Sequence, residues 1–251
     1  MLLIVLGGFV VLAQAADLKQ PETRETGGAV VFDKGSKVPL PEGYKLLYRQ
    51  EFENAAALHD LVMTDPKAWR FAPDERRHGA ELFQQSHYEP AVRSPLNIAL
   101  IADKVFGEFI LEAEMLSTKE PYPHQDMCLF FGVQDPTHFY YVHMAVAADP
   151  NAHNVFIVNN VPRVSIAKQT TKGIVWGVNQ WHRVRLERKP GDGSIRVFFD
   201  DMTRPIMIAE DKTFDSGCIG FGSFDDVGKV RNIRIWGPSV ETKKTGFFTR
   251  P

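Results

Sequence analysis

Residues 122–143 combine histidine, aspartate and tyrosine side chains at a spacing that could support chemistry. The segment reads YPHQDMCLFFGVQDPTHFYYVH and contains three of the eight histidines in the 251-residue chain. Imidazole, carboxylate and phenol groups are side chains that transfer protons or bind metal ions. The residues around them are mostly apolar and aromatic, which is typical of buried strands. The polar groups within this strand-like sequence are therefore the first candidates for a functional site.

Alternation along the two predicted strands directs four of these side chains to one face of a sheet. In the first strand His124 and Asp126 point away from the core, because the intervening positions are the more apolar set. In the second strand Tyr141 and His143 point the same way by the same rule. The strands are joined through the turn GVQDPTH and are expected to be neighbours in the sheet. We predict a cluster of these four candidate catalytic residues, facing a groove.

Downstream residues add candidate substrate-binding groups at the rim of this groove. Aromatic faces stack on sugar rings, and histidine, asparagine and arginine side chains hydrogen-bond to hydroxyls or carboxylates, so the composition suits a saccharide. The predicted substrate-binding residues are His153, Asn154, Arg163 and Gln125.

Two proton-transfer chemistries fit the cluster. In a lyase, Tyr141 or His143 would remove the proton next to a uronate carboxylate. Arg163 or Gln125 would neutralise that carboxylate. In a hydrolase, Asp126 would act as acid or base with His143 as its partner.

Metal ions are a third option. His124-x-Asp126 would supply two ligands of a two-histidine, one-carboxylate triad, completed by His143 or His182. Asp225, in the turn between the last two strands, is a candidate ligand for a structural calcium ion, although a simple turn explains the same residue. No cofactor is required by the sequence. The structural alternative for the whole cluster is that the histidines belong to turns and the tyrosines are ordinary strand aromatics.

The elements that must position these residues are short strands that recur about every ten residues, as in an antiparallel sandwich or barrel. The clearest local signal is ERKPGDGSIRVFFDD, in which Gly-Asp-Gly joins two alternating strands in a tight hairpin. In its first strand, Val184 and Leu186 are expected to face the core, and Arg183, Arg185 and Glu187 the water. Only residues 54–63 have a helical pattern.

Five successive segments show a family resemblance. They are FGEFILEAEM, an FFG strand, NQWHRVRLER, IRVFFDDMTRPIMIAED and GCIGFGSFDDVGKVRNIRIWG. Together they resemble the concanavalin A-like lectin/glucanase jelly roll. More closely, the chain is similar over residues 46–237 to bacterial secreted proteins with the 3-keto-disaccharide hydrolase domain and to putative family-16-type glycoside hydrolases. The resemblance implies an all-β sandwich of two antiparallel sheets, with a concave sheet that forms a groove for a saccharide chain.

The acidic motif E-x-D-x-x-E of family-16 laminarinases is absent from the sequence. Glu112 and Glu114 share one strand face, but no third acid follows at the required offset. Retaining hydrolysis needs two carboxyl groups about 5 Å apart. The leading expectation is an exported protein that binds and cleaves a polysaccharide or oligosaccharide, as a glycoside hydrolase or polysaccharide lyase. A non-catalytic carbohydrate-binding module is the main alternative, and an adhesion domain is a third.

The N-terminal sequence favours export. MLLIVLGGFVVLAQAAD has an apolar run followed by Ala-Gln-Ala, which predicts a signal peptide over 1–16, and the run is too short to span a bilayer. We therefore expect a secreted or periplasmic protein. Residues 17–43 are polar and broken by proline and glycine, which predicts an N-terminal arm or linker. One domain is expected over 44–237, followed by a disordered or loosely docked tail over 238–251.

The composition predicts a globular protein that does not bind nucleic acid. Apolar residues make up 44% and charged residues 24% of the chain, which predicts a packed core. The formal net charge of −2 gives no basic field to attract nucleic acid. Cys128 and Cys218 both lie within apolar runs, so we expect two buried, unpaired thiols.

Overall fold

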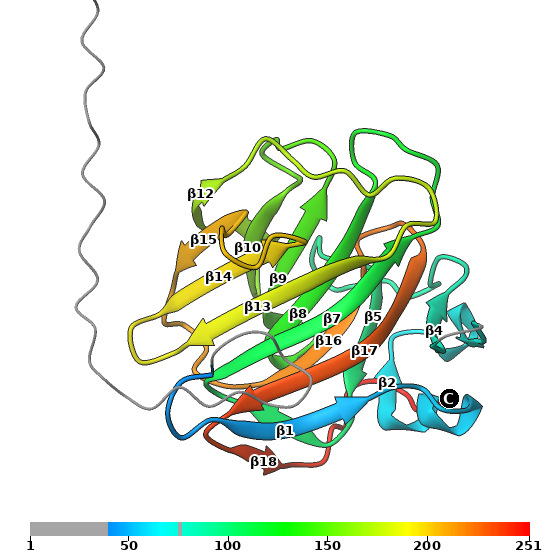
Figure 1. Ribbon diagram of the computed structural model, residues 1–251, viewed down its shortest axis with the longest axis horizontal. Helices are drawn as coiled ribbons and strands as arrows, with labels where there is room; N and C mark the ends of the chain where they lie inside the picture. The colour runs from blue at the N-terminus through cyan, green and yellow to red at the C-terminus, as the bar shows by residue number, and fades with distance from the viewer. Residues whose placement is uncertain (1–39, 75–76) are drawn as a thin grey trace, which may run out of the picture. The chain divides into compact units, whose positions relative to one another are not determined.

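The computed structural model describes residues 40–74 and 77–251. The expected signal peptide at 1–16 and nearly all of the expected arm at 17–43 lie outside these described residues. Residues Gly43–Pro251 form a compact unit, shown in Figure 1.

No helix within residues 40–74 and 77–251 has the length and apolar composition that a bilayer-spanning helix needs.

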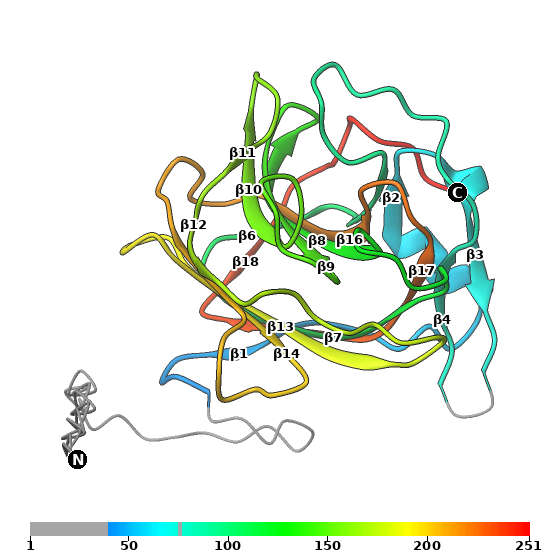
Figure 2. The same ribbon diagram turned by 90° about the horizontal axis from the view of Figure 1, so that it is seen from above.

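The compact unit is a sandwich of two antiparallel sheets, which form two layers in Figure 2. The larger sheet has nine strands among the described residues. In spatial order they are β12 (Ala167–Thr170), β15 (Met207–Glu210), β14 (Ser194–Phe199), β13 (His182–Lys189), β7 (Phe109–Ser117), β17 (Gly228–Gly237), β4 (Gly79–Leu82) and β3 (Trp69–Ala72), with β1 (Lys45–Gln50) also paired to β17.

The second sheet has seven strands in the part of the chain that the structure describes. In spatial order they are β11 (Val164–Ser165), β10 (Asn154–Asn159), β9 (His138–Ala145), β8 (Asp126–Asp135), β16 (Cys218–Ser223), β5 (Asn97–Ile101) and β2 (Leu61–Met63). Figure 2 shows that this sheet curves away from the nine-stranded sheet at its β11 edge.

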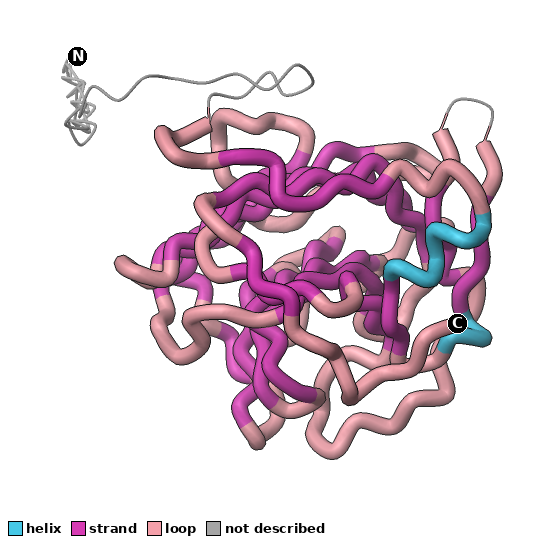
Figure 3. The backbone as a smooth tube through the Cα atoms, turned by 90° about the horizontal axis from the view of Figure 1, so that it is seen from below, coloured by secondary structure: helices cyan, strands magenta, loops and turns pink. Residues whose placement is uncertain are grey.

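Smaller elements complete the unit. β6 (Lys104–Phe106) pairs with β18 (Val240–Thr242). The helical pattern predicted at 54–63 is correct for the short 3₁₀ helix η1 (Ala55–Asp60) but wrong for its last three residues, which form β2. A second 3₁₀ helix is η2 (Pro66–Ala68). Figure 3 shows both helices at the end of the sandwich that carries the C-terminus.

The main hydrophobic core lies between the two sheets and follows from strand alternation. Val184 and Leu186 of β13 are buried in it, as predicted. Gly193 closes the predicted hairpin with a φ of +83°, a conformation that favours glycine. The expectation that Arg185 faces water is wrong, because this side chain is buried. Its guanidinium donates to the Glu112 carboxylate, which supplies the opposite charge that such burial requires.

A second apolar cluster covers the outer face of the seven-stranded sheet. Met127 and Val142 face the inter-sheet core, whereas Cys128, Phe130 and Tyr141 belong to the outer cluster. The predicted assignment of the two faces is therefore confirmed for residues 127–131 of β8 and 139–144 of β9. It is wrong for Val133, which belongs to the outer cluster because the strand register shifts between Phe131 and Asp135. The side chains of Val92, Phe247 and Phe248 pack on this outer cluster, so the face is covered where an open groove was expected.

The C-terminal segment is docked, and the expected loose tail at 238–251 is wrong. Strand β18 pairs with β6, and the backbones of Thr249 and Met63 exchange hydrogen bonds of 2.7 and 3.1 Å. Phe247 and Phe248 pack against the outer apolar cluster. Burial of these two aromatic rings provides the hydrophobic contact that holds the segment in place.

Candidate functional site

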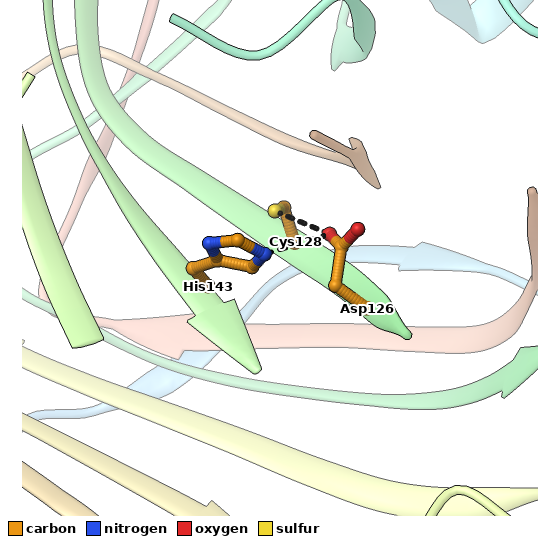
Figure 4. A group of neighbouring side chains, drawn as sticks. All are labelled: Asp126, Cys128 and His143. Atoms are coloured by element: carbon orange, nitrogen blue, oxygen red, sulfur yellow. Dashed lines mark hydrogen bonds and ion pairs between the residues drawn. The ribbon is translucent and has the colours of Figure 1, made fainter. Parts of the chain in front are cut away.

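Asp126 and His143 meet on the outer face of the seven-stranded sheet, where β8 begins and β9 ends. Cys128 lies directly across from His143 in the strand register, and Asp126 is two residues earlier on the same face of β8. Figure 4 shows the three side chains pointing toward one another. Asp126 and Cys128 are fully buried and His143 is 4% exposed. The sequence placed these groups on the right face, but the expectation that they line an open groove is wrong.

The Asp126 carboxylate is held by donors from distant parts of the chain. Its Oδ1 accepts a hydrogen bond from Ser223 Oγ at 2.9 Å. Its Oδ2 accepts from the Phe224 backbone N–H at 2.9 Å and from Cys128 Sγ at 3.1 Å. Burial works to raise the pKa of Asp126, but the His143 charge and these hydrogen bonds leave it below its ordinary value. Asp126 therefore remains ionised and fixes the 223–226 turn onto β8.

His143 is oriented by a carbonyl and an aromatic ring. Its Nδ1 lies 3.2 Å from the Asn151 carbonyl oxygen, which can only accept, so Nδ1 carries a proton. Its Nε2 lies 3.5 Å from Asp126 Oδ2. The imidazole also stacks on Phe224, with ring centroids 5.8 Å apart and an interplanar angle of 15°. The ring is thus fixed with Nε2 aimed at the carboxylate.

Asp226 is a second buried carboxylate beside this pair. Its Oδ2 accepts the backbone N–H of Asp126 at 3.0 Å, and its own N–H donates to Ser223 Oγ at 2.7 Å. Burial and the negative charge of Asp126 raise the pKa of Asp226 to about 6. The site therefore contains two aspartates whose pKa values are shifted in opposite directions.

Asp226→Asn is expected to reduce the pH dependence of stability. The pKa of Asp226 is about 6 in the folded protein against an ordinary 3.8, so the folded state binds this proton more tightly than the unfolded chain. Its stabilising contribution is greatest below pH 3.8 and is lost as the pH rises to 6. The variant should melt at a higher temperature than the wild type near neutral pH and at a similar temperature near pH 4. A melting difference that is equal at both pH values would contradict this assignment.

Arg163 is the predicted substrate-binding residue that the structure brings to the cluster. Its guanidinium lies 4.1 Å from the Phe224 ring centroid and 4.9 Å from that of Phe156. Its Nη1 donates to the Tyr141 hydroxyl at 2.8 Å. A guanidinium has five N–H donors, so this contact leaves others that can meet a ligand. Arg163 is half-buried, which leaves part of its side chain at the surface.

Tyr141 serves as a support for Arg163. Its side chain is fully buried on the outer face of the sheet. Burial raises the pKa of Tyr141 far above its ordinary value, although the Arg163 charge opposes the shift. The phenol therefore stays protonated near neutral pH, which argues against the predicted role as a base.

Asp225 and His124 lie at the surface near this cluster. Asp225 is exposed as a residue in the turn after β16, but its carboxylate is partly shielded from water by the neighbouring groups. This partial desolvation, together with the Asp126 charge, raises the pKa of Asp225. His124 was assigned to the Asp126 strand face, but it lies in the turn before β8. Its Nε2 is 2.6 Å from Asp149 Oδ2. Calcium binding at Asp225 stays a prediction.

Two other predicted site residues have structural contacts elsewhere. Gln125 is buried, and its Nε2 donates to Ser117 Oγ and the Lys119 carbonyl. His153 is buried beside Thr171 Oγ1, at 2.9 Å, and burial lowers its pKa to about 4 with the His143 charge adding to the effect. These two residues position loops and do not line the surface near Arg163.

Asn154 and His182 also fall outside the cluster. Asn154 Oδ1 accepts the Ala167 backbone N–H at 3.1 Å, which links two strands. His182, proposed to complete a metal triad, is buried in the other sheet between Asp200, at 2.7 Å, and the Trp176 carbonyl, at 2.8 Å. The predicted His124-x-Asp126 triad therefore does not assemble.

The sequence did not identify Phe224 and Ser223 as site residues. Both lie in the turn that carries Asp225, and they contact Asp126, which is about a hundred residues earlier in the chain. The signal that could have found them is the polar run Ser-Phe-Asp-Asp at the end of an apolar strand. Which strand lies beside it depends on the sheet order, and no local pattern gives that order.

Searches for similar proteins find no matching family model and no matching curated protein. Solved structures are similar in fold. A family 66 carbohydrate-binding module from Bacillus subtilis aligns with 15% identity over 73% of this chain and 96% of its own, at a TM-score of 0.50. A Bacillus subtilis protein of unknown function with a galectin-like fold aligns with 13% identity over 80% of this chain and 100% of its own, at 0.52.

A plant lectin shows the same similarity. Winged bean acidic lectin, solved with methyl-α-D-galactose, aligns with 11% identity over 80% of this chain and 100% of its own, at a TM-score of 0.50. The chain therefore has the two-sheet jelly-roll sandwich of lectin-like proteins, as the sequence predicted.

Proposed function

We propose that this protein is an exported carbohydrate-binding protein. Its binding surface is the exposed part of Arg163, Phe224 and Asp225, called here the Arg163 surface. The observation that carries the proposal is the fixed position of the Arg163 guanidinium, which lies close to two aromatic rings and is bonded to a buried tyrosine.

The chemistry of the Arg163 surface suits a sugar. Saccharide hydroxyls both donate and accept hydrogen bonds. The Arg163 guanidinium supplies donors for them, and the Asp225 carboxylate supplies acceptors. Phe224 adds an aromatic ring of the type that packs on sugar rings. The surface is held rigid from below, because Asp126 accepts the Phe224 N–H and Tyr141 accepts from Arg163. Rigid side chains lose little conformational entropy on binding, which favours affinity.

Similar folds agree with this proposal. The carbohydrate-binding module from Bacillus subtilis and the winged bean lectin bound to methyl-α-D-galactose share the two-sheet architecture at TM-scores of 0.50. The finer resemblance to 3-keto-disaccharide hydrolase proteins is part of the proposal and rests on the sequence motifs alone.

Arg163→Ala is expected to weaken binding to any glycan that the wild type retains on a panel. Charge-assisted hydrogen bonds contribute about 1.5–3 kcal/mol each, which corresponds to a loss of roughly 10- to 100-fold in affinity. Arg163→Lys should restore only part of it, because lysine keeps the charge but lacks the planar fork of donors. Isothermal titration calorimetry with the best panel glycan measures the change.

Arg196→Ala is the matched control. Arg196 also lies over an aromatic ring, 5.1 Å from the Phe198 centroid, and pairs with Glu187 at 3.4 Å, but it belongs to the nine-stranded sheet. This variant should bind glycans like the wild type. Equal affinities for the wild type and Arg163→Ala, with both proteins folded, would reject the Arg163 surface.

Glycan cleavage is a second candidate function, favoured by the raised pKa of the exposed Asp225 beside the ionised Asp126. A carboxyl group whose pKa is raised by partial burial and a neighbouring negative charge is suited to act as a general acid. Asp126 itself is fully buried and accepts three hydrogen bonds, so it acts on Asp225 through its charge. New reducing or unsaturated ends on a glycan panel would reveal cleavage, and Asp225→Asn should abolish it.

A further inference from the structure

Three different metal-binding donor atoms converge in the Asp126 cluster. Cys128 Sγ lies 3.1 Å from Asp126 Oδ2, and His143 Nε2 lies 3.5 Å from the same oxygen. The donor atoms of all three residues lie within 4.8 Å of one another. Figure 4 shows that the three side chains point toward one another. Zinc bonds to sulfur at about 2.3 Å and to nitrogen or oxygen at about 2.0–2.2 Å, so tetrahedral ligands lie about 3.3–3.7 Å apart. The Cys128–Asp126 and His143–Asp126 separations of 3.1 and 3.5 Å are close to that spacing.

The surroundings of the three donors resemble the hydrogen-bonded shell of a metal site. His143 donates through Nδ1 to the Asn151 carbonyl, which leaves Nε2 as the atom that faces Asp126. Histidine ligands usually donate their second ring nitrogen in this way, and ligating carboxylates are themselves hydrogen-bonded. Asp126 is held by Ser223 Oγ and the Phe224 N–H. These contacts fix two of the three donors without occupying Nε2.

His143 Nε2 faces Asp126 Oδ2, and a positive charge between these two atoms would stabilise the arrangement. In a neutral His143 with its proton on Nδ1, a nitrogen lone pair would point at a carboxylate oxygen 3.5 Å away, in a fully buried place. Either a proton on Nε2 or a metal cation removes this repulsion. Cys128 favours a metal cation over a proton, because its thiol lies beside these groups and supplies a second negative charge when it loses its proton to a metal.

We propose that Asp126, Cys128 and His143 form a binding site for a divalent transition-metal ion of the zinc class. A thiolate, an imidazole and a carboxylate select such an ion over calcium or magnesium, which prefer oxygen ligands. On binding, metal–sulfur and metal–nitrogen bonds replace the Cys128 S–H bond and any Nε2–H bond, and the protons pass to solvent. The carboxylate and thiolate neutralise the two charges of the ion.

The proposed site has three protein ligands. Structural zinc sites are usually closed by four, whereas sites with three leave one position for water or a ligand oxygen. Arg163 and Asp225 are charged residues at the surface, and both interact electrostatically with the Cys128 thiol. Asp225 also interacts electrostatically with Asp126 and His143. The metal proposal does not depend on the proposed saccharide binding, because it concerns the buried groups beneath the Arg163 surface.

Metal binding is tested with untagged full-length protein that has been stripped with a chelator and dialysed against zinc or cobalt(II) chloride. We expect one metal ion per chain by elemental analysis and a rise of several degrees in melting temperature. Cobalt should give the sulfur-to-metal charge-transfer band and the intense visible bands of a tetrahedral thiolate site. The wild type without bound zinc and without these cobalt bands would overturn the proposal.

Two cysteine variants make the test specific. Cys128→Ser should lose the charge-transfer band and bind zinc at least tenfold more weakly. Cys218→Ser is the matched control, since Cys218 is also an unpaired thiol of the outer apolar cluster and lines a separate cavity of about 280 Å³. It should keep both properties. A cobalt thiolate band that persists in Cys128→Ser would place the metal elsewhere and overturn the assignment.

His143→Gln provides a third variant that removes a ligand without touching a cysteine. It should also lose zinc affinity, and its circular dichroism spectrum should show whether the sheet structure is kept. Zinc affinity equal to that of the wild type in a folded His143→Gln protein would contradict the assignment, whatever the outcome of glycan binding.

Discussion

Asp126→Asn is expected to destabilise the protein by about 3 kcal/mol, which corresponds to a fall of roughly 6–12 °C in melting temperature. The asparagine amide cannot accept all of the hydrogen bonds that Ser223, Phe224 and Cys128 now donate to the carboxylate. Each buried donor left without a partner costs about 1–3 kcal/mol. The ionic interaction with His143 is also lost. Thermal and urea unfolding measure this change.

Asp225→Asn is the comparison for this prediction. Asp225 lies next to the same cluster but is exposed, so the change should alter stability by no more than about 0.5 kcal/mol. Similar melting temperatures for the Asp126→Asn protein and the wild type would show that Asp126 is not the structural anchor described above. This result also bears on catalysis, because activity lost in the Asp126→Asn variant cannot be assigned to chemistry unless the fold is intact.

Glu112→Ala should have an effect at least as large, through a buried ion pair in the other sheet. Glu112 Oε1 accepts from Arg185 Nε at 3.0 Å and from its Nη2 at 2.5 Å, and Oε2 accepts from Arg183 at 2.6 Å. Arg185 is 2% exposed, so removal of the carboxylate leaves a buried guanidinium whose remaining ion pair is the one with Glu187, at 3.2 Å. Breaking such a pair costs about 3–5 kcal/mol. Urea denaturation with fluorescence detection of the four tryptophans gives the free energy of unfolding.

The double variant Glu112→Leu with Arg185→Met distinguishes a lost pair from lost packing. Replacing both charges by apolar groups of similar size should recover most of the stability. Glu210→Ala is the exposed control, because the Lys168–Glu210 pair has side chains that are 62% and 54% exposed. Pairs of that kind contribute about 0–1 kcal/mol. Equal losses for Glu112→Ala and Glu210→Ala would show that burial of the pair has no energetic consequence.

Strand content was largely predictable because it depends on local chemistry. The runs that became β8, β9, β13 and β14 alternate or are strongly apolar, and Gly193 supports the hairpin turn between the last two. The short strand β4 has no such local signal. Its sequence Gly-Ala-Glu-Leu has no strand-favouring residue, and it pairs only because β3 and β17 lie on either side of it.

The candidate site was also predictable only where it depends on local strand geometry. Alternation alone determined that Asp126 and His143 share one face of the sheet, because side chains along a strand point to opposite faces by geometry. Only the tertiary structure decided that they are buried. That burial depends on β16 lying beside β8, which brings Phe224 over His143 and Ser223 onto the Asp126 carboxylate. These contacts join segments far apart in the chain, so no local pattern encodes them, and they decide whether a polar side chain meets water or a protein partner.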